Sequence, residues 1–186
     1  MQVEDEELML QAKAGTLESL EELIGRYERR LYGFVARFLK SSVEAEEVYQ
    51  EVWLRVFESR GRYEKRAKFS TWLYRIATNL CIDRVRRKRP TVEIVETADP
   101  EAGGVQLAGD HRRTPDAEAE QGELSRAIHK AVETLPAGQR EVFLLAEGEG
   151  MSYAEVSEIL SIPVGTVKSR MHHACQNLQT QLAAHR

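Results

Sequence analysis

The sequence predicts an all-α protein with two small helical domains, a flexible acidic linker between them, and a helix-turn-helix in the C-terminal domain. Apolar residues recur at spacings of three and four in both halves of the 186-residue chain, which is the period of an amphipathic helix. No stretch alternates apolar and polar residues for long enough to predict a sheet. The segment between the halves has no such period and is acidic, with several glycines and prolines. We therefore expect domains at residues 1–90 and 123–186 and a linker at 91–122.

Three helices are expected in the N-terminal domain. The first covers residues 16–39, with Thr16 placed to act as its N-cap. The second runs from residue 43 to about 58 after a capping Ser42. The third starts near Ser70, another capping residue, and continues to about residue 88, where Pro90 stops it.

The C-terminal domain contains two helical segments followed by a helix-turn-helix pattern. Helical period resumes at residues 123–135, and a short helix follows at 139–147. Ser152 can cap the next helix, with Glu155 at the third helical position. Pro163 interrupts the pattern, and a longer helix begins at Gly165. The spacing is that of a helix-turn-helix, in which Ser161 takes the turn position usually held by glycine.

Composition limits the classes of protein that are possible. The net charge of −4 gives no bulk attraction to nucleic acid, so only a local excess of positive charge could bind it. Two cysteines at no metal-like spacing, an acidic N-terminus and the lack of a long apolar run favour a soluble, cytoplasmic protein. No nucleophile, paired carboxylate or phosphate loop appears, so we expect neither an enzyme nor a cofactor or metal.

The second helix of the helix-turn-helix has no acidic residue from Gly165 to Leu178, although the chain as a whole is acidic. In such a motif this helix enters the major groove of DNA with its N-terminal residues leading. Its outward side chains can all donate hydrogen bonds to phosphates or base edges. They are Thr166, Lys168, Ser169, Arg170, His172 and His173. A plain helical hairpin is the alternative for this segment alone.

Aromatic and basic residues are interleaved around the start of the third helix. Exposed rings among cations suit single-stranded DNA, because bases stack on the rings while the cations hold the backbone. The residues of interest are Arg62, Tyr63, Lys65, Lys68, Phe69 and Trp72. The same helix ends in a basic run that includes Arg84, Arg86 and Arg87 and favours contact with a polyanion. The rings could instead belong to the core, and the basic run could be a solvated face.

The second helix of the N-terminal domain, expected at residues 43–58, is acidic, and its carboxylates would repel DNA phosphates. Tyr49, Gln50 and Trp53 widen its apolar stripe beyond what a core needs, which favours a protein partner. A solvated acidic face is the alternative.

Four segments resemble, in order and spacing, the motifs of the extracytoplasmic-function (ECF) group of bacterial RNA polymerase sigma factors. They are AEEVYQEVWLRVF, FSTWLYRIATNLCIDRVRR, LPAGQREVFLL and MSYAEVSEILSIPVGTVKSRMHHA. The resemblance covers about residues 18–89 and 122–182. It implies a factor that binds core RNA polymerase, recognises the −35 and −10 promoter elements and helps to open the promoter.

The resemblance also implies a role for particular residues. Gln50, Glu51 and Trp53 would dock on the clamp coiled coil of the largest polymerase subunit. The loop at residues 62–68 and Asn79 would read the −10 element by capturing a base flipped from the non-template strand. Lys168, Ser169, His172 and His173 match positions that face the −35 element, although many relatives have Arg where this chain has His173. An anti-sigma factor is an expected further partner.

Two other functions remain as alternatives. A stand-alone helix-turn-helix regulator would bind duplex palindromes as a homodimer without polymerase, but the acidic second helix and the single-strand-type loop argue against it. A metal sensor would use His172, His173 and Cys175, but adjacent histidines point to different faces of a helix.

Overall fold

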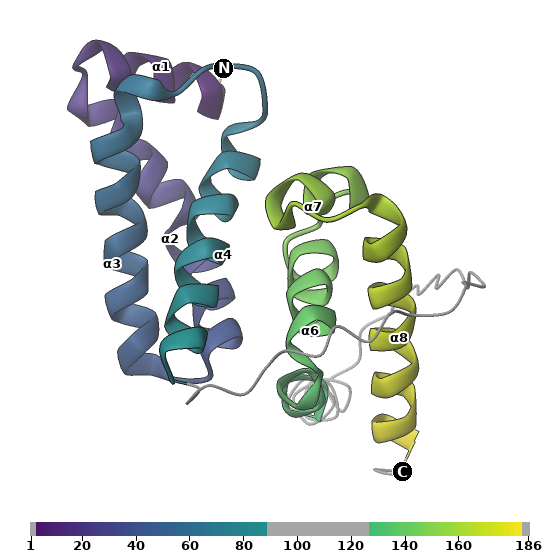
Figure 1. Ribbon diagram of the computed structural model, residues 1–186. Helices are drawn as coiled ribbons and strands as arrows, with labels where there is room; N and C mark the ends of the chain where they lie inside the picture. The colour runs from purple at the N-terminus through teal and green to yellow at the C-terminus, as the bar shows by residue number, and fades with distance from the viewer. Residues whose placement is uncertain (1–2, 89–126, 184–186) are drawn as a thin grey trace, which may run out of the picture.

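A computed structural model describes residues 3–88 and 127–183, and every regular element in these two ranges is helical. Figure 1 shows an N-terminal bundle of α1 (Asp5–Ala14), α2 (Leu17–Leu39), α3 (Ser42–Ser59) and α4 (Phe69–Lys88). Beside it lie α6 (Ala137–Phe143), α7 (Tyr153–Leu160) and α8 (Val164–Ala183). The all-α prediction is confirmed. The linker predicted at 91–122 lies outside the described residues, so its boundaries stay a prediction.

The N-terminal bundle contains the three predicted helices, with small changes at their ends. Thr16 is the N-cap of α2, but its side chain makes no capping hydrogen bond. The cap of α3 is Ser41, not Ser42, and its hydroxyl accepts a hydrogen bond from the Glu44 backbone N–H at 3.4 Å. The broad apolar face of α2 supplies the largest share of this bundle's core, including the fully buried Phe34. The apolar period therefore located the helices well and their caps less well.

The sequence analysis missed α1, which lies across one end of the bundle (Figure 1). This helix has only ten residues and begins with the acidic Asp5 and Glu6. Its buried side chains are Leu8, Met9 and Ala12, too few to give a clear helical period. Its dependence on the rest of the bundle is expected, because isolated helices of this length are marginal in water.

In the C-terminal domain, residues 127–134 are helical, and α6 continues directly into η2 (Leu144–Gly148), a π-helical turn. The capping box at α7 is complete. The Ser152 hydroxyl accepts from the Glu155 backbone N–H, and the Glu155 carboxylate accepts from the Ser152 backbone N–H at 2.9 Å. Ser161 adopts the left-handed conformation at φ 55°, which closes the turn before α8. The helix-turn-helix is therefore formed as the sequence predicted.

The two domains pack against each other through α4 with α7 and through α2 with η2 (Figure 1). Glu149 is part of this contact, and its side chain is only 1% exposed. Its carboxylate pairs with Arg37 at 3.1 Å and with Arg30 at 3.4 Å, and it accepts a hydrogen bond from the Tyr74 hydroxyl. Burial raises the pKa of Glu149, while the hydrogen bond from Tyr74 and the two arginines oppose that rise. A buried carboxylate of one domain is thus held by three side chains of the other.

Candidate nucleic-acid interface

The outer face of α8 is the first candidate surface for DNA. The opposite face is buried through Val167, Met171, Ala174 and Leu178. Lys168 is exposed, while Thr166, Ser169 and His172 are half-buried. The Ser169 hydroxyl donates to the Thr166 backbone carbonyl at 3.2 Å, so its oxygen stays available as an acceptor. The N-terminal half of α8 therefore offers several polar groups and no carboxylate.

Arg170 and His173 are oriented differently from one another. The Arg170 guanidinium packs closely on Gly138 of α6. A Cβ added at position 138 would lie only 3.1 Å from the Arg170 Cζ. Arg170 also lowers the pKa of the nearby Glu141, against a rise that burial causes. The His173 ring lies 5.6 Å from that of His172, edge to face. Arg170, predicted from sequence to point outward, thus packs against α6.

The loop that joins α3 to α4 carries the basic residues predicted to meet the −10 element. Arg62, Lys65 and Lys68 are all exposed. Lys65 pairs with Glu4 at 3.2 Å, and Lys68 pairs with Glu155 of α7 at 2.8 Å. Both lysines are therefore paired with carboxylates in this arrangement of the domains. To bind these lysines, DNA phosphates would have to displace the two carboxylates.

The aromatic residues of this loop form a cluster of their own. Tyr63 and Phe69 are 2% and 0% exposed, and their ring centroids lie 6.3 Å apart. Trp72 is half-buried, 5.2 Å from Tyr63 and 6.1 Å from Phe69. Tyr27 of α2 meets Phe69 edge to face at 5.4 Å. Tyr63 and Phe69 are thus core residues here and offer no open ring to a base, contrary to the interpretation from sequence.

A pocket of about 360 Å³ lies between the C-terminal half of α3 and the middle of α4. Its wall contains the exposed Asn79 together with Arg62 and Asp83. The Asn79 amide has both donors and an acceptor, Arg62 only donates and Asp83 only accepts. Such a mixed rim suits the edge of a nucleobase, which also presents donors and acceptors side by side. The structure therefore brings Arg62 of the predicted loop to Asn79, whereas Lys65 and Lys68 line a separate pocket beside α1.

The basic run at the end of α4 lies beside the acidic helix α3. Arg84 pairs with Glu47 at 2.7 Å, and Lys88 pairs with Glu44. Arg86 and Arg87 are exposed. The acidic face of α3 thus neutralises part of the run, and Arg86 and Arg87 remain on the surface for a polyanion.

The candidate protein-binding surface on α3 differs from the one expected. Gln50 is exposed and Glu51 pairs with Arg55 at 2.9 Å, but Trp53 is buried at 8% exposure. Tyr49 is half-buried and packs edge to face on Tyr32 at 6.0 Å. The exposed apolar side chains of this helix are Val43, Leu54 and Phe57, which are 69%, 56% and 39% accessible. Sequence reasoning missed Leu54, although an apolar residue opposite the buried stripe of a helix is the signal that could have found it.

No group of His, Cys, Asp and Glu side chains within residues 3–88 and 127–183 is arranged to hold a metal ion. In the same two ranges, no helix combines the length and the apolar character that a crossing of the bilayer requires.

Comparison with known proteins identifies the two domains as regions 2 and 4 of a sigma factor. The family profile of Sigma-70 region 2 matches residues 23–91, and that of Sigma-70 region 4 matches residues 125–178. This pairing defines the class as RNA polymerase sigma factors, which bring core polymerase to promoter DNA to start transcription. Within that class, the chain belongs to the extracytoplasmic-function (ECF) group.

Individual relatives cover nearly the whole chain. The ECF RNA polymerase sigma factor SigW of Bacillus subtilis is 36% identical over 179 residues, which is 92% of this chain and 93% of SigW. The RNA polymerase sigma-H factor of Pseudomonas aeruginosa is 29% identical over 187 residues, or 97% of this chain and 95% of the relative. The family assignment predicted from the four motifs is therefore confirmed.

Two solved structures have a similar fold. CnrH in complex with the cytosolic domain of CnrY gives a TM-score of 0.71 at 23% identity, covering 97% of both chains. The sigma factor RpoE of Bartonella quintana, in complex with the anti-sigma factor NepR, gives 0.66 at 22% identity, covering 89% of this chain and 98% of RpoE. At this level of identity the comparison concerns the fold alone.

Proposed function

We propose that this sigma factor divides promoter recognition between its two domains, with α8 reading the −35 element and the Asn79 pocket reading the −10 element. The observation that carries the proposal is that pocket, which combines a mixed polar rim with the basic end of the same helix. A pocket of this kind suits a single extruded base, whereas a recognition helix suits an intact groove. The two sites thus require DNA in two different states.

The −35 element is read in the major groove by Lys168, Ser169 and His172. The support is their position on one outward face of the second helix of a helix-turn-helix, clear of carboxylates. Thr166 and His173 border this face, and Arg170 would leave Gly138 to reach a phosphate. Specificity therefore comes from the first turns of α8.

The −10 element is opened and read by the N-terminal domain. Asn79 contacts the extruded base, and Arg62, Lys65, Lys68, Arg84, Arg86 and Arg87 hold the phosphates of the separated strands. Trp72, the one half-buried ring of the loop cluster, borders this surface. Tyr63 and Phe69 contribute by shaping the loop from within, because they are buried.

Core polymerase docks on α3. The exposed Gln50, the partly exposed Glu51 and the accessible apolar Leu54 and Phe57 form the surface that meets it. An exposed large apolar side chain beside charged groups is typical of a protein interface. Trp53 supports this surface from inside, and Tyr49 borders it.

Because the protein works with polymerase on promoter DNA, it acts in the cytoplasm. Its proposed regulator is an anti-sigma factor.

A promoter library transcribed by core polymerase, with and without this chain, tests the proposal. We expect transcription only with the chain and from promoters that share both elements. Ser169→Ala should change the preference at the −35 element, by about 1–3 kcal/mol for each lost base contact, and leave opening intact. Asn79→Ala should do the reverse, with poor permanganate reactivity on duplex promoters and weak −10 discrimination.

Thr180→Ala is the matched control for Ser169→Ala. Thr180 is exposed further along α8, and its hydroxyl bonds the Gln176 carbonyl at 3.0 Å much as Ser169 bonds Thr166. It should leave the promoter preference unchanged. If Asn79→Ala were equally defective at every −10 sequence and on pre-melted DNA, Asn79 would be structural and the base-capture role would be wrong. Binding of palindromic duplex DNA as a homodimer without polymerase would favour the stand-alone regulator.

A further inference from the structure

The N-terminus of α4 lacks a cap from its own sequence. The residue before the helix is Lys68, whose side chain has no acceptor for the first backbone N–H groups of the helix. The Phe69 backbone N–H instead donates to the Oε1 of Glu6 at 2.7 Å. Glu6 lies 63 residues away in α1, and its carboxylate supplies the cap that the local sequence does not. A distant helix thus fixes the start of the helix that carries Asn79.

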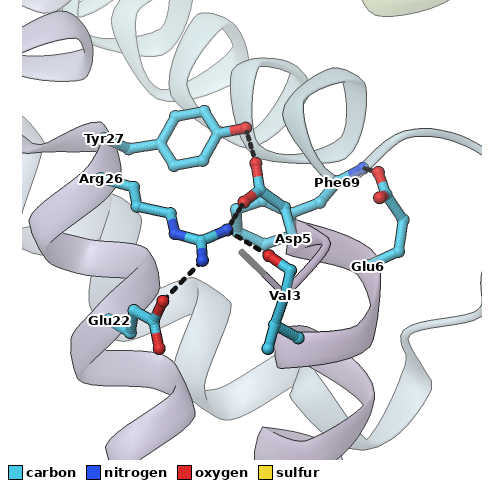
Figure 2. Close-up of polar contacts among 7 residues, drawn as sticks. All are labelled: Val3, Asp5, Glu6, Glu22, Arg26, Tyr27 and Phe69. Atoms are coloured by element: carbon cyan, nitrogen blue, oxygen red, sulfur yellow. Dashed lines mark hydrogen bonds and ion pairs between the residues drawn. The ribbon is translucent and has the colours of Figure 1, made fainter. Parts of the chain in front are cut away.

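The position of Glu6 is set by its neighbour Asp5, which ties α1 to α2. Asp5 accepts hydrogen bonds from Arg26 and from the Tyr27 hydroxyl, each at 2.5 Å. Arg26 also donates to the Val3 backbone carbonyl at 2.7 Å and to Glu22 at 2.5 Å. Figure 2 shows Asp5 directed to α2 and Glu6 directed to Phe69, so two adjacent carboxylates on α1 serve two different helices.

The same helix also holds the basic loop in front of α4. Lys13 donates to the Tyr63 backbone carbonyl at 2.8 Å, and Glu4, at the N-cap of α1, pairs with Lys65 at 3.2 Å. Together with the bond from Glu6 to Phe69, these contacts hold the segment at residues 63–69 at its first residue, at Lys65 and at its last residue. The profile of Sigma-70 region 2 starts at residue 23, so α1 lies outside the part of the chain it matches.

We propose that Glu6 is a positioning residue for −10 recognition. By capping α4 from α1, Glu6 fixes the loop at residues 63–68, here called the −10 loop, relative to the Asn79 pocket. Lys13 assists by fixing the first residue of the loop. The proposal rests on the proposed role of α4 at the −10 element. Without the cap, the first turn of α4 can fray, and the loop that depends on it loses its fixed position relative to Asn79.

The test compares Glu6→Ala with Glu6→Gln in the full chain with core polymerase. We expect Glu6→Ala to lower the opening of duplex promoters roughly fivefold, the factor that corresponds to a typical lost cap. It should also weaken discrimination among −10 sequences while the −35 preference stays normal. Glu6→Gln should restore both, because its amide oxygen can still accept from Phe69. Glu7→Ala, at the exposed next position, is the control and should behave as the wild type.

Lys13→Met provides a second variant that keeps the apolar stem and removes only the bond to Tyr63. It should give a smaller defect of the same kind. If Glu6→Ala and Lys13→Met both opened promoters and discriminated −10 sequences normally while Asn79→Ala did not, the positioning role would be overturned and the pocket would stand. If Asn79→Ala were normal as well, the proposed −10 site itself would fail. Equal loss of −10 and −35 preference in Glu6→Ala would reduce Glu6 to a general stabiliser.

Discussion

The two surfaces proposed to read the promoter are constructed in opposite ways. The helix-turn-helix is supported from within its own segment, by the Ser152–Glu155 capping box and the left-handed Ser161. The −10 surface is held by side chains far away in sequence, with Glu6 at a separation of 63 residues and Lys13 at 50. A duplex reader needs only a rigid helix on a local frame. A surface for opened DNA needs a loop, and here contacts from α1 hold that loop.

The largest expected effect tests whether the −10 rings support the loop or contact DNA. Phe69→Ala should lower the free energy of unfolding by about 3–5 kcal/mol, because the ring is fully buried among Tyr27, Tyr63 and Trp72. Phe57→Ala, which removes the same side chain from an exposed site on α3, should cost less than about 1 kcal/mol. Urea unfolding of both variants measures the difference. If the Phe69→Ala protein were as stable as the wild type and failed only in promoter opening, the ring would contact DNA and would not be a core residue.

The second effect concerns the contact between the two domains at Glu149. Glu149→Ala leaves Arg30, Arg37 and Tyr74 without their shared carboxylate, which should weaken the domain contact by about 2 kcal/mol. The domains should then separate, and Lys68 should lose its pairing with Glu155. Small-angle scattering of the free chain would report a larger radius of gyration. Glu147→Ala, exposed two residues earlier, is the control and should leave the scattering curve unchanged.

The contrast between local and distant support also explains what the sequence could predict. The helix-turn-helix was predicted correctly down to its cap and its turn, because Ser152, Glu155 and Ser161 act within a few residues of one another. The existence of α1 and the capping by Glu6 were not, because their partners are set by the tertiary fold. The same reason applies to α3. The width of its apolar stripe suggested an exposed Trp53, but only packing decides that Trp53 is buried and Leu54 is exposed.

The third effect distinguishes phosphate contacts from base contacts. Arg86→Ala should weaken promoter binding equally for all sequences and reduce the salt dependence of the affinity by about one unit. Arg29→Ala, at an exposed position on α2, should change neither. Fluorescence anisotropy of holoenzyme on two promoters over a range of salt concentrations provides the measurement. A sequence-dependent loss in Arg86→Ala would mean that this arginine reads a base.

The smallest effect is a pH dependence at the point where the two surfaces meet. The pKa of Glu155 is lowered to about 2, first by the hydrogen bond from Lys68 and then by those from Ser152. Since the unfolded value is near 4.5, this carboxylate stabilises the fold fully above that pH. The contribution is lost as the pH falls from about 4.5 towards 2. Because the pair lies near the surface, the effect is small and salt screens it.

Lys68→Met separates the contribution of the neighbouring domain from that of the local cap. Removing the largest cause should raise the pKa of Glu155 towards its usual value, while the bonds from Ser152 keep it partly lowered. Ser152→Ala should raise it less, because Lys68 is the larger cause. Carboxyl-detected NMR titration of Glu155 between pH 2 and 6 measures both shifts. An unchanged titration in Lys68→Met would mean that α7 and the −10 loop do not touch in solution, and the local capping box alone would then account for the lowered pKa.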